Sequence, residues 1–328
     1  KSMAGYVAAT GRPLNIPDVY RIAATLPYSF SKQFDQASGY KTQSAFTFPL
    51  KTANGNILGI LQIINAQDEN RNKIPFSEQD EKMMAHFAGV AAVALERAQM
   101  TRAILLRMIK MAELRDPKET GPHVNRVAGY AVEIYERWAQ KRNLDHKEID
   151  RTRDVLRMAA MLHDVGKVGT SDLILKKPGR LTKEEFEIMK QHTLFGARLF
   201  GDRQSDFDVA AAKVALNHHE KWNGSGYPGY IDLRTGIPLD DKARPDGSAQ
   251  GKKGEEIPLF GRIVALTDVF DALSSKRCYK EAWDESKVLA TIEIDAGAHF
   301  DPELVEIVFS RLKIIRPIQE RYKHEPED

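Results

Sequence analysis

The chain has 328 residues, 42% of them hydrophobic and 29% charged, which favours two globular domains with separate cores. A net charge of +2 gives no argument for binding a nucleic acid polymer, and no run approaches the ~20 apolar residues of a membrane span. The single cysteine, Cys278, excludes an intramolecular disulfide and a cysteine-based zinc cluster, and it favours a reducing, cytoplasmic location.

Residues 1–76 predict a small α/β domain, and Asn54-Gly55 is a strong hairpin signal within it. The expected elements are a short helix from Gly5 and strands at 14–16, 44–50 and 57–64. The order of GYVAATGRPLNIPD and PLKTANGNILGILQIINAQD resembles the second half of a GAF domain. The resemblance implies a module that senses an unidentified small molecule, and a purely structural or dimerising module is the alternative. Because the chain begins in mid-domain without an initiator methionine, we expect it to be a fragment.

Residues 77–115 predict one long helix, which Ser77 and Asp80 begin with a capping box and Asp116-Pro117 ends. Apolar and small residues recur along it at alternating spacings of three and four, as in a heptad seam. The seam consists of Met84, Phe87, Ala91, Ala94, Ala98, Thr101, Leu105, Met108 and Ala112. This pattern favours a parallel coiled-coil homodimer, and packing of the seam on the chain's own domains is the alternative.

Residues 116–328 predict a nearly all-helical domain. The expected helices are 124–141, 148–163, 183–200, 207–219, 262–274, 286–295 and 302–312. Thr182 and Glu185 form a second capping box, and Asp301-Pro302 is an N-cap followed by proline at the first helical position. Residues 229–253 are rich in Gly, Asp and Lys and predict a long loop.

Side chains of the metal-ligating type are spread over these helices, with His163-Asp164 at the end of an apolar helix as their centre. The set is Glu119, His123, His163, Asp164, His192, His218, His219 and Asp268. One histidine on an apolar helix is usually a core residue, but several buried imidazoles and carboxylates need partners, and a shared metal cluster satisfies them together. Imidazole and carboxylate are the usual protein ligands of Mn, Fe and Zn.

The segments LRDPKETGPH, HDVGKVG, HHEKWNGSGYP, KKGEEIPL and TDVFDALSSKRCYK follow one another as in the HD-GYP family of HD phosphohydrolases. The resemblance covers residues 113 to about 315. It implies a C-terminal all-α HD-type bundle, and so an α+β two-domain chain of partial GAF-like domain (1–76), connecting helix (77–115) and catalytic domain (116–328). It also implies a phosphodiesterase that opens cyclic di-GMP to pGpG and often on to GMP, with two or three divalent metal ions, iron first and manganese second.

Carried over by position, the resemblance makes His123, His163, Asp164, His192, His218, His219 and Asp268 the metal ligands. Asp164 would bridge two metals and Lys167 would contact the scissile phosphate, so these two are the predicted catalytic residues. Gly226, Tyr227 and Pro228, with Arg277 and Lys280, would hold the second phosphate and a guanine. A solvated basic surface is the alternative for Arg277 and Lys280. Glu119 would ligate a third metal, with a helix-start charge as its alternative.

The implied chemistry suits a metal centre, because two metals ~3.5–4 Å apart lower the pKa of bound water towards ~7 and clamp the phosphoryl oxygens. The chain departs from the family pattern at Asn223, at Cys278, in the spacer between His123 and His163, and in the long insertion 229–253, none of which removes a predicted ligand. Two other functions stay open. One is a non-catalytic cyclic di-GMP receptor, and the other is a phosphohydrolase of another nucleotide.

Overall fold

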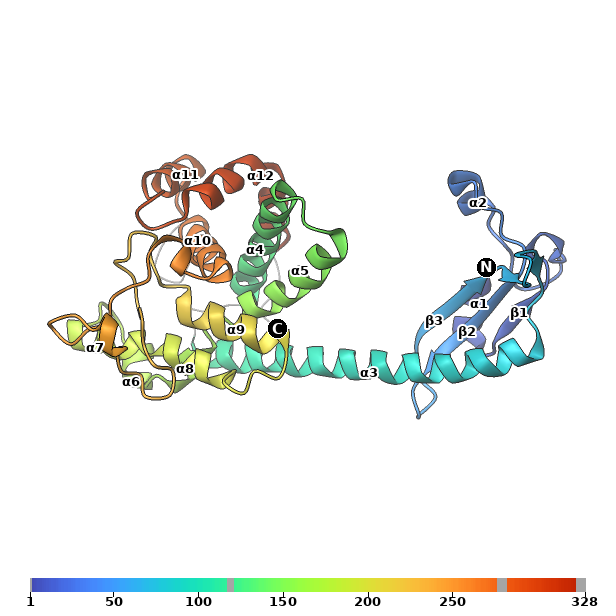
Figure 1. Ribbon diagram of the computed structural model, residues 1–328, viewed down its shortest axis with the longest axis horizontal. Helices are drawn as coiled ribbons and strands as arrows, with labels where there is room; N and C mark the ends of the chain where they lie inside the picture. The colour runs from blue at the N-terminus through green and yellow to red at the C-terminus, as the bar shows by residue number, and fades with distance from the viewer. Residues whose placement is uncertain (1, 117–120, 276–281, 323–328) are drawn as a thin grey trace. The chain divides into compact units, whose positions relative to one another are not determined.

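The computed structural model describes residues 2–116, 121–275 and 282–322. The chain divides into two compact units, residues 1–104 and 105–328, each with its own core. The predicted fold class is confirmed: a mixed α/β unit comes first, a long helix follows, and the second unit is helical (Figure 1). Within the described ranges, no helix is both long and apolar enough to cross a membrane.

The first unit is built on an antiparallel sheet of order β1-β2-β3. Its strands are β1 (Leu14–Ile16), β2 (Ala45–Lys51) and β3 (Ile57–Ile64). The predicted hairpin is confirmed, and Gly55 in its turn has φ of 84°, a conformation that glycine adopts without a Cβ clash. The other elements are α1 (Met3–Thr10), η1 (Val19–Arg21), α2 (Gln33–Ser38), β4 (Ala66–Gln67) and β5 (Lys73–Ile74).

Alternation along β2 gives the sheet two apolar faces. Ala45 packs with Met3 of α1 on one face. Phe46 and Phe48 pack on the other face with Ala88 of the long helix α3 (Glu78–Arg115). The first turns of α3 therefore belong to the core of the first unit.

The predicted long helix is confirmed with its capping box, in which the Asp80 amide donates to Ser77 Oγ (3.2 Å) and the Ser77 amide donates to Asp80 Oδ2 (2.7 Å). The predicted seam is not one continuous exposed strip, because Met84 packs in the first core and Leu105 against the second. Phe87, by contrast, is 53% exposed. The exposed large apolar residues of α3 are Met83, Phe87, Val90, Val93, Met100, Ile104, Leu106, Met111 and Leu114.

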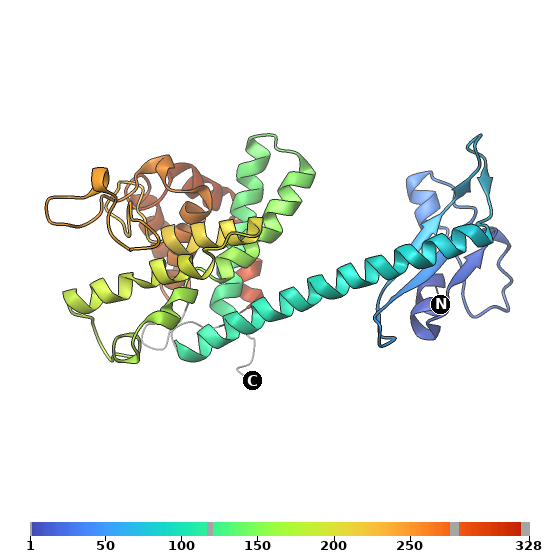
Figure 2. The ribbon, with the colours of Figure 1, turned by 60° about the horizontal axis from the view of Figure 1, so that its bottom comes forward.

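The second unit is a bundle around α4 (Gly121–Lys141), whose buried side chains include Tyr130 and Ile134. Helix α4 packs against α5 (His146–Met161), which lies beside it in both views, and against α10 (Leu259–Ser274) and α12 (Pro302–Arg321) (Figures 1 and 2). The remaining helical elements are η2 (Val165–Gly169), α6 (Asp172–Leu175), α7 (Lys183–Lys190), α8 (His192–Leu199), α9 (Asp206–Asn217), η3 (Asp240–Lys242), η4 (Gly254–Glu256) and α11 (Glu285–Ile294).

Two predicted helices differ from those in the structure. The single helix expected over 183–200 is two helices, α7 and α8, separated at Gln191, although the capping box of Thr182 and Glu185 is present. Helix α12 runs past its expected end at 312 to Arg321, with Pro317 inside it. The insertion 229–253 is a loop as predicted, with η3 and the isolated bridges Ile231–Pro238 and Ala243–Ala249.

Candidate metal centre

The structure brings together every predicted metal ligand within its described residues. Asp164, His192, His218 and His219 form one group, and His123, His163 and Asp268 form a second, with the ligand atoms of each group within 4.8 Å of one another. They come from the ends of α5, α8 and α9, from the first turn of α4 and from the interior of α10. Glu119 lies outside the described residues.

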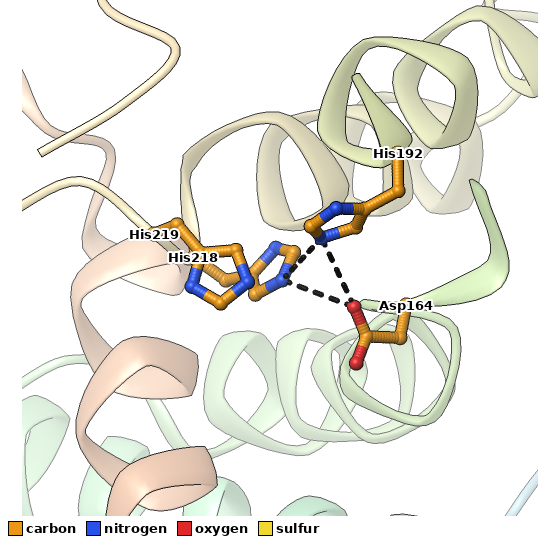
Figure 3. A group of neighbouring side chains, drawn as sticks. All are labelled: Asp164, His192, His218 and His219. Atoms are coloured by element: carbon orange, nitrogen blue, oxygen red, sulfur yellow. Dashed lines mark hydrogen bonds and ion pairs between the residues drawn. The ribbon is translucent and has the colours of Figure 1, made fainter. Parts of the chain in front are cut away.

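Asp164 lies between the two groups. Its Oδ1 atom is 3.1 Å from Nε2 of His192 and 3.4 Å from Nε2 of His218, whose rings turn toward it in Figure 3. Its Oδ2 atom is 3.3 Å from Nε2 of His163, in the second group. One carboxylate therefore faces both sets of nitrogens with different oxygens, which is the geometry that a ligand shared by two metals requires.

The backbone fixes which nitrogen of each ring faces the centre. Nδ1 of His163 lies 2.8 Å from the Ala160 carbonyl oxygen, and Nδ1 of His192 lies 2.7 Å from that of Met189. Nδ1 of His218 lies 3.0 Å from the Ala215 carbonyl in the same way. Because a carbonyl oxygen can only accept, Nδ1 carries the hydrogen, and in the neutral ring Nε2 presents its lone pair to the centre.

The electrostatics favour the protonation states that metal ligands need. Burial, together with the neighbouring imidazoles, lowers the pKa of both His218 and His219, so these rings are neutral. Burial alone would raise the pKa of Asp164, but the charges of Lys167 and His163 outweigh it and hold that pKa well below its usual range. Nε2 of His192 lies only 3.4 Å from Nε2 of His218, so one bound cation could contact both nitrogens. This donor set fits a divalent cation.

Asp271 is a functional residue that the sequence reasoning missed. It is fully buried, and its Oδ2 lies 2.8 Å from Nδ1 of His123. Arg126 donates to the same carboxylate through Nε (2.6 Å) and Nη2 (2.9 Å), so Asp271 keeps Nδ1 of His123 protonated and turns Nε2 toward Asp268. The signal was present, since Asp271 follows Asp268 by three residues and so lies on the same face of α10.

The Gly226-Tyr227-Pro228 segment lies beside the first ligand group. The Tyr227 ring stacks on the ring of His219 with centroids 4.8 Å apart, and the Tyr227 amide donates to the His219 carbonyl (3.1 Å). A Cβ atom on Gly226 would come within 2.3 Å of the Lys221 nitrogen, so only glycine fits this close return of the chain. Arg277 and Lys280, the other predicted substrate contacts, lie outside the described residues.

Glu220, directly after the two adjacent histidines, was also missed. Its buried carboxylate accepts from the amide of Gly229 (2.6 Å) and from the amide of Lys252 (3.2 Å), near the two ends of the insertion 229–253. Nζ of Lys252 donates to Asn217 Oδ1 (2.6 Å), on the last residue of α9. The base of the insertion is therefore fastened to the helix that leads into His218 and His219.

Family models match both parts of the chain: the GAF domain over residues 1–95 and the HD domain over residues 120–273. The chain is 39% identical over 207 residues to a cyclic di-GMP phosphodiesterase of Vibrio cholerae serotype O1, and 38% identical over 218 residues to one of Thermotoga maritima. It is 33% identical over 239 residues to the 3'3'-cGAMP-specific phosphodiesterase 2 of the same Vibrio strain.

These alignments take in 62%, 66% and 71% of the chain, in the same order. They span only 38%, 50% and 40% of the relatives' own lengths. The two family matches agree with the order of the elements, since the sheet unit falls in the first match and all seven gathered ligands fall in the second. The chain therefore has two matched segments, residues 1–95 to the GAF domain and residues 120–273 to the HD domain.

Proposed function

We propose that this chain is a metal-dependent phosphodiesterase of the HD-GYP type that hydrolyses cyclic di-GMP. The observation that carries the proposal is Asp164, placed between two groups of imidazole and carboxylate donors whose Nε2 atoms face inward. The three relatives are named as phosphodiesterases of cyclic dinucleotides, which supports this substrate class. The proposed boundaries are those expected from the sequence, with residues 116–328 as the catalytic domain.

The site residues would have three different roles in this reaction. Two bound metals would supply a hydroxide nucleophile and neutralise the phosphoryl charge. His123, His163 and Asp268 would hold one metal, His192, His218 and His219 the other, and Asp164 both. Lys167, with Nζ 2.7 Å from Asp164 Oδ2, offers a cationic donor to a phosphate oxygen at the edge of the centre. Gly226, Tyr227 and Pro228, with Arg277 and Lys280, would hold the rest of the dinucleotide.

Product analysis tests the activity directly. The protein is reconstituted without oxygen with Fe(II) or Mn(II) and given cyclic di-GMP, with 3'3'-cGAMP in parallel. We expect cyclic di-GMP to yield pGpG and then GMP, faster with iron than with manganese. Tight binding without hydrolysis would instead support the receptor function. Cleavage of 3'3'-cGAMP alone would keep the enzyme class and replace the substrate.

The proposed number of metals depends on Glu119. It lies four residues before His123, so on a helical turn both side chains point the same way. We expect the wild type to hold close to three metals per chain and Glu119→Ala close to two, measured by elemental analysis after reconstitution without oxygen. The loss should be one metal because His123 remains in both proteins. Two metals in both proteins would make Glu119 only a helix-start charge.

The proposal includes a homodimer through α3 and regulation by a small molecule bound to the GAF domain, in a cytoplasmic protein. The exposed apolar residues of α3 support the dimer, because Phe87 and Val90 are each more than half exposed. Since Leu105 packs in the chain's own core, the variants to test are Phe87→Glu and Val90→Glu, which should give monomers in sedimentation. Variants that still sediment as dimers would place the interface elsewhere.

A further inference from the structure

The last residue of α3 is fastened to the segment that carries Lys167. Arg115 donates through Nη2 to the Thr170 carbonyl (2.8 Å), through Nη1 to the Val168 carbonyl, and through Nε to Asp172 Oδ1 (3.2 Å). These acceptors lie in or just after η2, the 3-10 turn of residues 165–169 that follows Asp164. One rigid guanidinium thus joins the C-terminal end of α3 to the turn beside the predicted metal ligands.

Asp116, the next residue, contacts Lys167 directly. It is only 2% exposed, and its Oδ2 lies 3.2 Å from Nζ of Lys167. The same ammonium is 2.7 Å from Asp164 Oδ2. Lys167 therefore lies between a carboxylate predicted to bind metal and one that belongs to neither ligand group.

A small cavity lies between the end of α3 and the segment that carries Asp164 and Lys167. Ile109, Ala112 and Asp116 line it from the α3 side, and Asp164 and Lys167 line it from the other. Its volume is about 20 Å³, which is room for about one water molecule. The end of α3 therefore lies next to the segment that carries Asp164 and Lys167.

The chemistry gives Asp116 a specific role. A lysine side chain has four flexible bonds and a strongly hydrated charge, so it keeps one position only if its partners fix it. When metals take up the charge of Asp164, that carboxylate attracts Lys167 less, whereas Asp116 keeps its charge and its contact with the ammonium. We propose that Asp116 is a positioning residue for Lys167, with Arg115 holding the turn, so that the last turn of α3 sets the phosphate-binding part of the centre.

This inference rests on the proposed function, and it connects the GAF domain with Lys167 through α3. Helix α3 is unbroken from Glu78 to Arg115, and it begins within residues 1–95, where the GAF domain matches (Figure 2). A rotation or shift of α3 would reach Lys167 through Arg115 and Asp116 without crossing a flexible loop. We therefore expect α3 to control phosphate binding, and not metal binding.

The test is a double-mutant cycle on the full chain, loaded with Mn(II), with inorganic phosphate as a binding probe and cyclic di-GMP as substrate. Asp116→Asn should keep its metal and weaken phosphate binding about tenfold, with a similar rise in KM and a smaller change in kcat. In a Lys167→Ala background the same substitution should have no further effect, because Asp116 acts through Lys167. Asp116→Glu should restore part of the affinity. Asp172→Asn, which removes the exposed partner of Arg115, is the matched control and should change little.

Unchanged phosphate affinity in Asp116→Asn, or effects that add to those of Lys167→Ala, would overturn the inference. If Asp116→Asn does not fold, Arg115→Lys provides the second variant. It keeps the charge but loses the fork on η2, and it should weaken phosphate binding in the same direction by a smaller factor. Phosphate binding needs no turnover, so its result stands even if cyclic di-GMP proves not to be the substrate.

Discussion

Asp35 in the first unit and Asp164 in the second are both largely shielded from solvent, and they are held in different ways. Asp35, in the first unit, accepts from the Tyr20 hydroxyl (2.7 Å), the Thr42 amide (2.7 Å) and the Thr42 hydroxyl (2.8 Å). Asp164, in the second, faces imidazole nitrogens and the Lys167 ammonium. Neutral hydroxyl and amide donors hold Asp35, whereas the partners of Asp164 are predicted metal ligands or a charged side chain.

The causes of their pKa shifts differ in the same way. Burial alone would raise the pKa of Asp35, but the hydrogen bonds from Thr42 and Tyr20 outweigh it and lower that pKa. For Asp164 the opposing causes are chiefly the charges of Lys167 and His163. Both carboxylates are ionised at neutral pH, yet only the second has neighbours that a cation could displace or join. The comparison thus separates a carboxylate that stabilises its fold from one that is available for chemistry.

The largest expected effect is the loss of the centre on replacing Asp164. Asp164→Ala should lower bound metal and reduce hydrolysis by at least about 10³-fold, or about 4 kcal/mol of transition-state stabilisation, while the helical fold remains. Elemental analysis, circular dichroism and product analysis measure the three quantities. The matched control, Asp35→Asn, should leave metal content unchanged and lower only the stability of the first unit. A metal-replete, fully active Asp164→Ala protein would rule out the two-metal centre.

A smaller effect should follow from replacing Asp271, which contacts the predicted ligand His123 and lies outside both ligand groups. Asp271→Asn leaves His123 without its carboxylate partner, so metal affinity should fall about 10- to 100-fold. Asp301→Asn is the control, because Asp301 also pairs with an arginine, the half-buried Arg262 (2.6 Å), and forms no ion pair with a predicted ligand among the described residues. Competition with a chelator gives both affinities. Equal affinities in the two variants would mean that Asp271 only supports the fold.

The difference between Asp268 and Asp271 shows what the sequence could and could not predict. The ligands were predictable because histidines and carboxylates are improbable on helix faces that are otherwise apolar. Asp271 looks the same in the sequence, but its role depends on Arg126, 145 positions away, which only the packing of α4 on α10 brings near. The hairpin predicted from Asn54-Gly55 and the predicted capping boxes are confirmed, because they depend on hydrogen bonds and backbone angles within a few residues.

The residues of the α3 seam have different surroundings, which the sequence could not predict for the same reason. Heptad spacing identifies an apolar face but not what covers it. Met84 is covered by the sheet and Leu105 by the helical core, whereas Phe87 is left exposed. Likewise, the break at Gln191 between α7 and α8 has no proline or glycine to announce it. Each of these outcomes depends on contacts between elements distant in the sequence.

The smallest expected effect concerns His299, a half-buried histidine outside the two ligand groups. Burial, aided by the charge of Lys221, lowers the pKa of His299 from its usual value to about 4. Below about pH 6.5 the unfolded chain therefore binds a proton at His299, whereas the folded protein binds this proton only near pH 4. Its contribution to stability is therefore complete above about pH 6.5 and is lost as the pH falls toward 4.

The slope that this ring adds is at most about 1.4 kcal/mol per pH unit, and it is smaller because part of the ring reaches solvent. Urea unfolding of the metal-free protein at pH 7 and pH 5 measures it. His299→Gln should lose less stability over this interval than the wild type, whatever its stability at pH 7. His218 and His219, whose pKa values are also lowered, remain in both proteins, so the difference between the slopes isolates His299. Equal slopes would mean that the folded protein protonates His299 as readily as the unfolded chain does, and that its surroundings are open to water.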